Sequence, residues 1–359
     1  MSRFLNERLA AAAPYQPGEQ PQDRRYVKLN TNESPFPPSP AVCAALAQAE
    51  AASRLNLYPD PACGALHAAI ARRYGLAPEQ VLAGNGSDEL LAFCFFAFTG
   101  ASRGVAFPAI SYGFYPVFAS LCGADALQLP LRPDFSIAPE DYFGLKRMIV
   151  LANPNAPTGI ALTRAQVEAI VRENPDAPVV VDEAYVDFGA ESAVPLVNRY
   201  ENLVVVQTFS KSRNLAGLRL GMAMAGQTLI ADLNAVKYSF NPYNVSRLAQ
   251  LAGAAAIGDE AYFCRCTDAV RRERARTEAA LKAMGFFVLP SQANFLFARH
   301  AGLPGGALYA ALKARGVLVR HFERPDLTSF VRITIGTGEQ MDALLGAVRD
   351  ILRERGVSR

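Results

Sequence analysis

Three short runs of aliphatic residues constrain the fold of this chain most strongly. They are Met148–Ala152, Val179–Val181 and Leu203–Val206, and the residues between them include a helical pattern over about 164–173. Wholly apolar runs of this length are typical of strands buried on both faces of a sheet. With further short strands expected at 104–107, 126–131 and 220–225, the sequence predicts an α/β fold with a mostly parallel sheet covered by helices.

The pattern changes after residue 258. Asp259 is a suitable N-cap for a long helix that ends before Gly285, and short strands and helices then mix over the rest of the chain. A length of 359 residues suffices for two domains. We therefore predict a proline-rich extended arm over 1–40, a large domain over 41–257 and a small α+β domain over 258–359.

Composition excludes several classes of protein. A net charge of +3 from interspersed acids and bases gives no sign of a nucleic-acid partner, and the longest apolar runs are too short to cross a membrane. The six cysteines show no metal or redox spacing, and the three histidines lie far apart in the sequence. With no signal peptide at the N-terminus, these features favour a cytoplasmic protein with reduced thiols and no metal centre.

Polar side chains follow each of the three apolar runs. Asn153 follows the first, Asp182 and Tyr185 follow the second, and Ser210 and Lys211 follow the third. Because the carboxyl ends of parallel strands meet at one edge of a sheet, these side chains should converge on one crevice. Taken singly, each has an ordinary explanation, such as a surface lysine or an acid at a turn.

A second polar segment is Gly84-Asn-Gly-Ser-Asp88, where small residues lead into a helix. Exposed backbone N–H groups and the helix dipole favour a phosphate at such a point. It is no dinucleotide fingerprint, because Glu89 stands where the third glycine would be. Alone, this segment is a weak signal and fits a plain glycine turn.

One ligand, pyridoxal phosphate, explains these residues together. It needs a lysine for its aldehyde, a carboxylate for its ring nitrogen, a hydroxyl or amide at its ring oxygen, and a phosphate site. A lysine becomes nucleophilic when burial or nearby cations lower its pKa, and Arg213 and Arg219 stand close to Lys211 in sequence. We therefore predict that Lys211 binds this cofactor covalently.

Three motifs carry a resemblance to a known family. Asn153-Pro-Asn-Ala-Pro-Thr-Gly159, Asp182-Glu-Ala-Tyr185 and the segment from Thr208 to Arg219 resemble the fold-type-I aminotransferases, which have a large domain with a seven-stranded sheet and depend on pyridoxal phosphate. In order and spacing the motifs are most similar to the histidinol-phosphate aminotransferase subfamily, and the resemblance extends from Tyr15 to Gly336.

The resemblance implies a role for each candidate residue. Lys211 is the covalent anchor and the base that moves the proton, Asp182 pairs with the ring nitrogen, and Tyr185 approaches the ring hydroxyl. The other implied residues are Asn153 at the ring hydroxyl, Tyr112 stacked on the ring, Gly86, Ser87, Asp88, Ser210 and Arg219 at the phosphate, Tyr58 reaching that phosphate from a second subunit of a homodimer, and Tyr15, Asn32, Arg320 and Arg332 at the substrate.

The reaction implied is a ping-pong amino transfer between L-histidinol phosphate and 2-oxoglutarate in histidine biosynthesis. Two alternatives share the fold, namely an aromatic amino-acid aminotransferase and a decarboxylase of threonine-phosphate type. A non-catalytic cofactor-binding regulator is a third, although the sequence has no attached basic helix-turn-helix segment.

Overall fold

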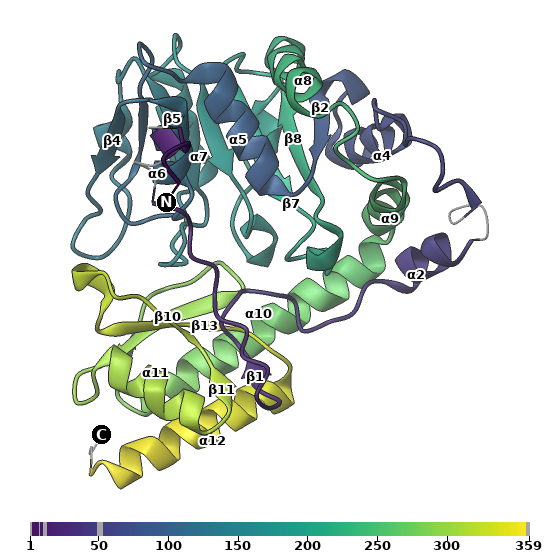
Figure 1. Ribbon diagram of the computed structural model, residues 1–359. Coiled ribbons are helices and arrows are strands. Elements are labelled where there is room, and N and C mark those ends of the chain that lie inside the picture. Colours follow the sequence, from purple (N-terminus) through teal and green to yellow (C-terminus); the bar gives the residue numbers. More distant parts are fainter. Residues whose placement is uncertain (1, 7, 10–12, 49–52, 357–359) are drawn as a thin grey trace.

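The computed structural model of the chain describes residues 2–6, 8–9, 13–48 and 53–356 (Figure 1). Its upper part in Figure 1 is built on a seven-stranded sheet and its lower part on a four-stranded sheet. The strands of the large sheet, in spatial order, are β2 (Val81–Gly84), β8 (Gly221–Ala225), β7 (Leu203–Thr208), β6 (Val179–Asp182), β5 (Met148–Ala152), β3 (Val105–Pro108) and β4 (Ala126–Leu129).

The sheet is parallel from β4 to β7, as the apolar runs predict. β8 is antiparallel both to β7 and to β2, so the sheet is mixed at this edge. No strand was predicted at 81–84, yet these residues form the strand β2. The reason is that this short segment is held by its pairing with β8, a partner about 140 positions away that no local pattern reveals.

Alternate residues of each central strand pack on opposite faces of the sheet. Val179 and Val181 belong to one buried cluster, whereas Val180 belongs to another. Six helices supply most of the packing against these faces. Residues of α4 (Gly64–Tyr74), α7 (Arg164–Arg172) and α9 (Arg247–Gly258) lie in the first cluster, and residues of α5 (Ser87–Phe98), α6 (Tyr115–Cys122) and α8 (Gln227–Phe240) lie in the second.

A single long helix, α10 (Glu260–Ala283), leads from the large sheet to the small one (Figure 1). It begins as predicted, because the Asp259 side chain accepts a hydrogen bond from the Tyr262 N–H, and Gly285 follows it with a φ of 83°. The small sheet is antiparallel, in the order β12 (Arg320–His321), β13 (Phe330–Thr334), β10 (Phe295–His300) and β9 (Phe286–Val288). The helices α11 (Gly305–Ala314) and α12 (Gly338–Glu354) contribute buried residues to the same core.

The arm joins the two parts of the molecule. It runs from the side of the large sheet to the small domain, where β1 (Val27–Lys28) pairs in parallel with β11 (Val317–Leu318) (Figure 1). Leu29 is buried in the core of the small domain, and α2 (Pro40–Ala47) follows. Residues 317–321 are therefore divided between two sheets, since β11 pairs with the arm and β12 pairs with β13.

Short 3₁₀ turns complete the described secondary structure: η1 (Pro78–Gln80), η2 (Pro139–Tyr142), η3 (Val186–Phe188), η4 (Val194–Leu196), η5 (Ala216–Leu218) and η6 (Pro325–Leu327). A search of the described helices finds none with the length and apolarity needed to span a bilayer.

Candidate active site

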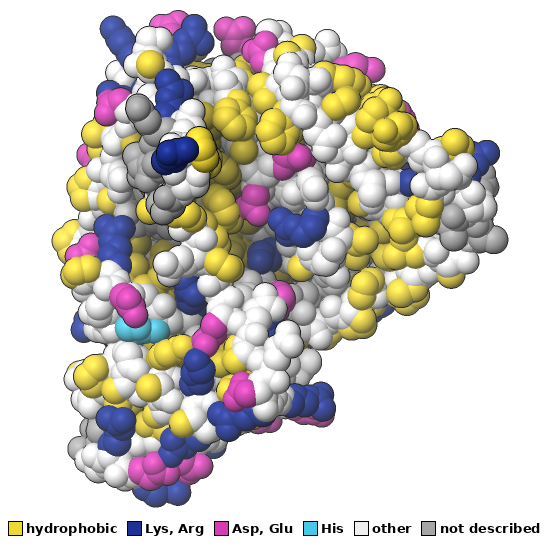
Figure 2. All heavy atoms as spheres, viewed as in Figure 1, with side chains coloured by type: hydrophobic (Ala, Val, Ile, Leu, Met, Phe, Trp, Pro, Cys, Tyr) yellow, Lys and Arg dark blue, Asp and Glu magenta, His cyan; other side chains and the backbone are white. Residues whose placement is uncertain are grey.

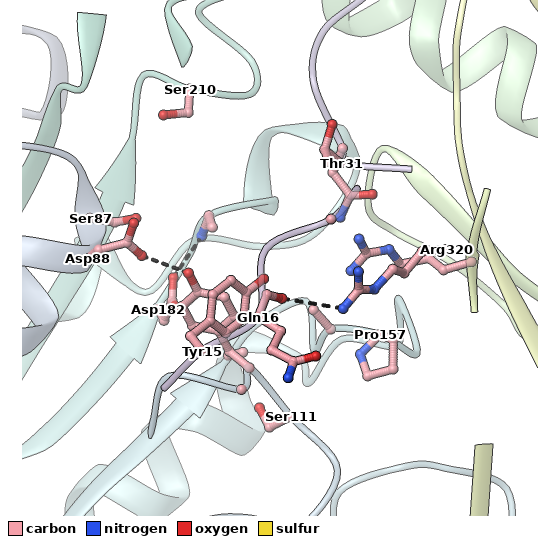
Figure 3. A pocket seen from close by; sticks show the side chains of 18 of the residues that line it. Tyr15, Gln16, Thr31, Ser87, Asp88, Ser111, Pro157, Asp182, Ser210 and Arg320 are labelled. Atoms are coloured by element: carbon pink, nitrogen blue, oxygen red, sulfur yellow. Dashed lines mark hydrogen bonds between the residues drawn. The ribbon is translucent and has the colours of Figure 1, made fainter. Parts of the chain in front are cut away.

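A cavity of about 920 Å³ lies at the carboxyl ends of the parallel strands. Asp182, Tyr185, Ser210 and Lys211 line it together, as the positions of these residues in the sequence predict. The register of the sheet explains this convergence, because Asp182 lies beside Ala152 on β5 and beside Val206 on β7. The arm and the small domain complete the wall with Asn32 and Arg332, and with Tyr15 and Arg320, which Figure 3 labels.

Lys211 presents its amine inside this cavity. Its Nζ donates a hydrogen bond to the Thr31 carbonyl of the arm at 3.3 Å and lies 5.9 Å from the centre of the Tyr185 ring. Burial, and secondly the charge of Arg332, lower the pKa of Lys211 to about 8. A substantial fraction of the amine is therefore neutral near pH 8, as a nucleophile requires.

Asp182 provides a carboxylate in the same cavity. One carboxylate oxygen accepts a hydrogen bond from the Tyr115 hydroxyl at 2.8 Å, and the other accepts one from the Ala184 N–H at 3.2 Å. Burial raises the pKa of Asp182 to about 6, against the smaller opposing effect of these hydrogen bonds. A cation placed against this carboxylate would stabilise its charged form.

The loop before α5 allows an arginine to approach the start of the helix. Gly86 has a φ of 84°, and a Cβ there would stand 2.6 Å from Arg219 Nη2. A Cβ on Gly221 would come equally close, at 2.6 Å, to the backbone carbon of Gly86. The two glycines thus leave room for a guanidinium beside the N–H groups of Ser87 and Asp88, a combination that suits a phosphate.

The Asp88 side chain is engaged in other contacts. Its carboxylate accepts a hydrogen bond from the Tyr112 hydroxyl at 2.7 Å and forms an ion pair with Arg219 at 3.1 Å. An anionic carboxylate repels a phosphate, so Asp88 can contribute to the predicted phosphate site only through its backbone N–H. Its side chain orients Tyr112 and Arg219.

Asn153 is not among the residues that line the cavity, so its predicted contact with the ring hydroxyl stays a prediction. Its side-chain nitrogen donates to the Leu162 carbonyl at 3.2 Å, and its side-chain oxygen accepts from the Leu162 N–H at 2.8 Å. With both ends of the amide engaged, Asn153 braces the loop after β5. Tyr185 does line the cavity, and its hydroxyl accepts a hydrogen bond from Asn32 Nδ2 at 3.0 Å.

Two arginines face the cavity from the small domain. Arg332 Nη2 donates to the Asn30 carbonyl at 3.1 Å, while its buried Nε has no hydrogen-bond partner in the described structure. Arg320 donates at 3.4 Å to the backbone carbonyls of Gln16 and Pro17 in the arm. In Figure 3, Ser87, Asp88 and Asp182 lie on one side of the cavity and Arg320 lies on the other.

Tyr15 covers the space between these two sides, together with Gln16 (Figure 3). Its ring stacks on Phe114 with centroids 4.3 Å apart and lies 5.9 Å from the Tyr112 ring. The arm therefore closes the cavity with a flat aromatic surface. Tyr58, by contrast, lies outside this cavity: its side chain is 77% exposed and its ring stacks on Tyr243.

Sequence reasoning missed two groups that contact the key side chains. Tyr115 is buried and holds the Asp182 carboxylate, and the Thr31 carbonyl holds the Lys211 amine. Tyr115 is the first residue of α6, three positions after Tyr112, and no pattern in the sequence singled it out. No sequence signal identifies a backbone carbonyl as a partner.

The described residues fit pyridoxal phosphate. The cavity combines an amine of lowered pKa, a buried acid that lacks a cationic partner in the structure, and an arginine at a helix start that only glycine permits. These meet three of the cofactor's four requirements, namely those of its aldehyde, its ring nitrogen and its phosphate. No group of three or more metal-ligating side chains occurs in the part of the chain that the structure describes.

Comparison with known proteins agrees with this fit. A family model described as "Aminotransferase class I and II" matches residues 24–348. The chain belongs to the class I and II aminotransferase family. The histidinol-phosphate aminotransferase of Aromatoleum aromaticum is 50% identical over 357 residues, which cover 98% of this chain and 100% of that protein.

Solved structures of related aminotransferases show the same fold. The histidinol-phosphate aminotransferase of Sinorhizobium meliloti, determined in complex with pyridoxal-5'-phosphate, superposes with a TM-score of 0.87 at 23% identity and covers 99% of each chain. The L-threonine-O-3-phosphate decarboxylase of Porphyromonas gingivalis superposes with a TM-score of 0.78 at 24% identity, over 91% of this chain and 99% of that one. The fold therefore does not separate aminotransferase from decarboxylase.

Membership of this aminotransferase family confirms four predictions from the sequence: the family itself, the α/β fold, an enzyme that transfers amino groups, and pyridoxal phosphate as cofactor. The substrates of such an enzyme are an amino compound and an oxo acid. The roles of single residues stay predictions, to which the geometry above gives a physical basis.

Proposed function

We propose that this aminotransferase exchanges an amino group between L-histidinol phosphate and 2-oxoglutarate, forming imidazole acetol phosphate and glutamate. The observation that carries the proposal is the identity of about half of all positions, over nearly the whole chain, to proteins named histidinol-phosphate aminotransferase. The two arginines at the substrate end of the cavity support it, because both substrates carry an anionic group there.

The described residues would hold the cofactor as follows. Lys211 would bind its aldehyde, Asp182 its ring nitrogen and Tyr185 its ring oxygen, while Tyr112 would lie over the ring. The start of α5 at Ser87, together with Ser210 and Arg219, would hold the phosphate. Bound pyridoxal phosphate supplies an electron sink for the bonds at the α-carbon of the substrate.

The other steps depend on side chains of this chain. Lys211 would accept a proton in its neutral form and return it, which its pKa of about 8 permits near neutral pH. The negative charge of Asp182 favours a protonated nitrogen beside it, by about 4 kcal/mol at 4 Å and an effective dielectric constant near 20. Tyr15 would exclude water by covering the cavity.

Arg332 is our candidate for the anion of both substrates. A guanidinium binds a phosphate or a carboxylate through two parallel N–H donors, so one arginine can serve both half-reactions. The Nε of Arg332 is buried without a partner, which leaves a donor free for an incoming anion. Arg320 lines the same cavity as Arg332 but donates to two carbonyls of the arm. We therefore assign Arg320 a role in holding the arm over the bound substrate.

The stacked Tyr15 and Phe114 rings support a second candidate, an aromatic amino-acid aminotransferase, because they would accept any flat side chain. Single-turnover conversion of the bound cofactor should be compared for histidinol phosphate, phenylalanine and threonine phosphate. We expect the fastest turnover with histidinol phosphate. A preference for phenylalanine would support the second candidate, and CO₂ release from threonine phosphate would indicate a decarboxylase.

We also infer that the enzyme is a homodimer in which Tyr58 reaches the cofactor phosphate of the other subunit. Large apolar side chains are exposed on one face, among them Phe240 at 69% and Phe96 at 47%, whose rings stack. Figure 2 shows hydrophobic side chains gathered at its upper right, over the region where α8 and α9 lie in Figure 1. Contiguous apolar surface of this kind is characteristic of interfaces.

The cysteines support our inference that the enzyme works in the cytoplasm. All six are free thiols in the described structure, at positions 43, 63, 94, 122, 264 and 266. Unpaired thiols are stable in a reducing compartment.

A further inference from the structure

The loop from Tyr58 to Pro61 is held firmly although its aromatic side chain points out of the molecule. Three side chains donate hydrogen bonds to its backbone carbonyls. Arg247 Nη2 donates to Tyr58 at 2.9 Å, Gln250 Nε2 donates to Asp60 at 2.9 Å, and Lys237 Nζ donates to Pro61. The backbone of this loop is therefore held by one donor on α8 and two on α9.

Lys237 is the most unusual of the three donors. Only 1% of it is exposed, and the hydrogen bond described for its amine goes to the neutral Pro61 carbonyl. The nearby Asp60 carboxylate instead accepts from the N–H groups of Ala62 at 2.9 Å and Gly64 at 2.8 Å, at the start of α4. Because burying an ammonium group is costly, a buried lysine of this kind indicates a specific requirement for the position of the loop.

The Tyr58 ring is also supported from the side. It stacks on Tyr243 with centroids 4.4 Å apart and an angle of 20° between the planes. The next residue, Asn244, donates to Glu89, which accepts a second hydrogen bond from the Asn85 N–H in the loop before α5. Tyr58 is therefore rigidly placed relative to the phosphate site of its own chain, yet its ring remains 77% exposed.

We propose that Lys237, together with Arg247 and Gln250, positions Tyr58 for insertion into the cavity of a second copy of this chain. The proposal rests on the homodimer proposed above and assigns to these three residues a role that acts through Tyr58. Holding the loop before association avoids the entropy loss of ordering it at the interface. Lys237, Arg247 and Gln250 are thus positioning residues and do not contact the reacting atoms.

The test is a double-mutant cycle between Lys237→Met and Tyr58→Phe. The rate of cofactor release is measured for the wild type, both single variants and the double variant, and dimer dissociation of the cofactor-free proteins is measured by sedimentation. Ser239→Ala is a matched control on the same helix, because its hydroxyl donates to the Ala235 carbonyl at 2.8 Å and it is exposed. Arg247→Met tests the same proposal if Lys237→Met does not fold.

We expect Lys237→Met to speed cofactor release about tenfold in the wild-type background, since a hydrogen bond from a charged donor is lost. In the Tyr58→Phe background, Lys237→Met should change the rate of cofactor release by less than about twofold. The reason is that the tyrosine hydroxyl which Lys237 positions is already absent from that background. Arg247→Met should behave in the same way, and Ser239→Ala should change neither release nor dimerisation.

Three results would overturn the proposal, and they differ in meaning. An equal effect of Lys237→Met in both backgrounds would show that the lysine acts only on the stability of its own chain. A wild type that sediments as a monomer, or a Tyr58→Phe variant that releases cofactor at the wild-type rate, would refute the shared site proposed above and this inference with it.

Discussion

Burial shifts the two principal ionisable groups of the site in opposite directions. It lowers the pKa of the Lys211 amine to about 8 and raises the pKa of the Asp182 carboxyl to about 6. The same physical cause, loss of solvation of the charged form, makes the lysine more nucleophilic and leaves the acid in need of a cation. The pKa of each group is therefore set by its burial in the cavity and not by its residue type alone.

Replacing Lys211 by alanine should abolish covalent capture of the cofactor. Borohydride reduction of the wild type should add the mass of the reduced cofactor to the peptide that contains Lys211, as seen by mass spectrometry, and reduction of the variant should add none. Transamination should fall by more than about a thousandfold. Lys282→Ala, which removes an exposed lysine on α10, should retain both properties.

Replacing Asp182 by asparagine should stabilise the cofactor-free chain at pH 7.5. The pKa of Asp182 is raised from 3.8 to about 6, so the folded state binds its proton more tightly than the unfolded state. The stability of the wild type should then fall as pH rises from about 4 to 6, by about 3 kcal/mol in total. Urea unfolding should show the variant more stable at pH 7.5 and equal to the wild type near pH 4.

The same variant should transaminate far more slowly, because it lacks the charge beside the ring nitrogen. A variant less stable than the wild type at pH 7.5 would contradict our account of Asp182. Glu183, whose pKa burial raises to about 7, is present in both proteins and does not affect the comparison.

At the scale of elements, the arm accepts hydrogen bonds from three cationic side chains of the site. Three basic side chains that line the cavity each donate to an arm carbonyl: Lys211 to Thr31, Arg332 to Asn30, and Arg320 to Gln16 and Pro17. An extended segment leaves its carbonyls free for such bonds, whereas a helix would use them internally. The prolines that prevent a helix here thus suit the arm to its place over the cavity.

Replacing Arg320 by glutamine should loosen the arm. The amide is too short to reach both carbonyls of residues 16 and 17, so hydrogen exchange of the peptide around residues 13–19 should become faster in the absence of substrate. The KM for the phosphorylated substrate should rise about tenfold or more. Arg324→Gln is the matched control, since Arg324 also lines the cavity but donates to Ala109 of the large domain; exchange of the arm should be unchanged.

At the scale of the whole molecule, the apolar face of α5 and α8 has no partner within the described chain. Phe240 is 69% exposed at the end of α8, beside Phe96 of α5. Phe240→Glu should therefore convert the proposed dimer to a monomer in sedimentation and weaken cofactor retention, because Tyr58 would no longer reach a second cavity. Phe287→Glu, at an exposed position on β9, should leave the dimer intact.

Much of the fold and site could be predicted from local patterns. The runs at 148–152, 179–182 and 203–208 are strands because β-branched and aliphatic residues favour a surface buried on both sides, and their polar ends converge because the strands are parallel. Lys211, Asp182 and Tyr185 were identifiable for this reason, and so was the helix start at Ser87.

The remaining features depend on contacts between distant residues. β2 is a strand only because β8 pairs with it, Asn153 is engaged by Leu162, and Tyr115 reaches Asp182. The direction of β8 and the division of 317–321 between two sheets likewise follow from partners far along the chain.

The sequence by itself determined the central strands of the large sheet, the order of the motifs and the residue types that a cofactor site needs. Only the tertiary structure decided which of those residues face the cavity, which atoms hold Lys211 and Arg320, and that Tyr58 points outward. The physical reason is that a run of buried aliphatic residues is visible in the local sequence, whereas hydrogen-bond partners and the pairing of short strands depend on which distant segments pack together.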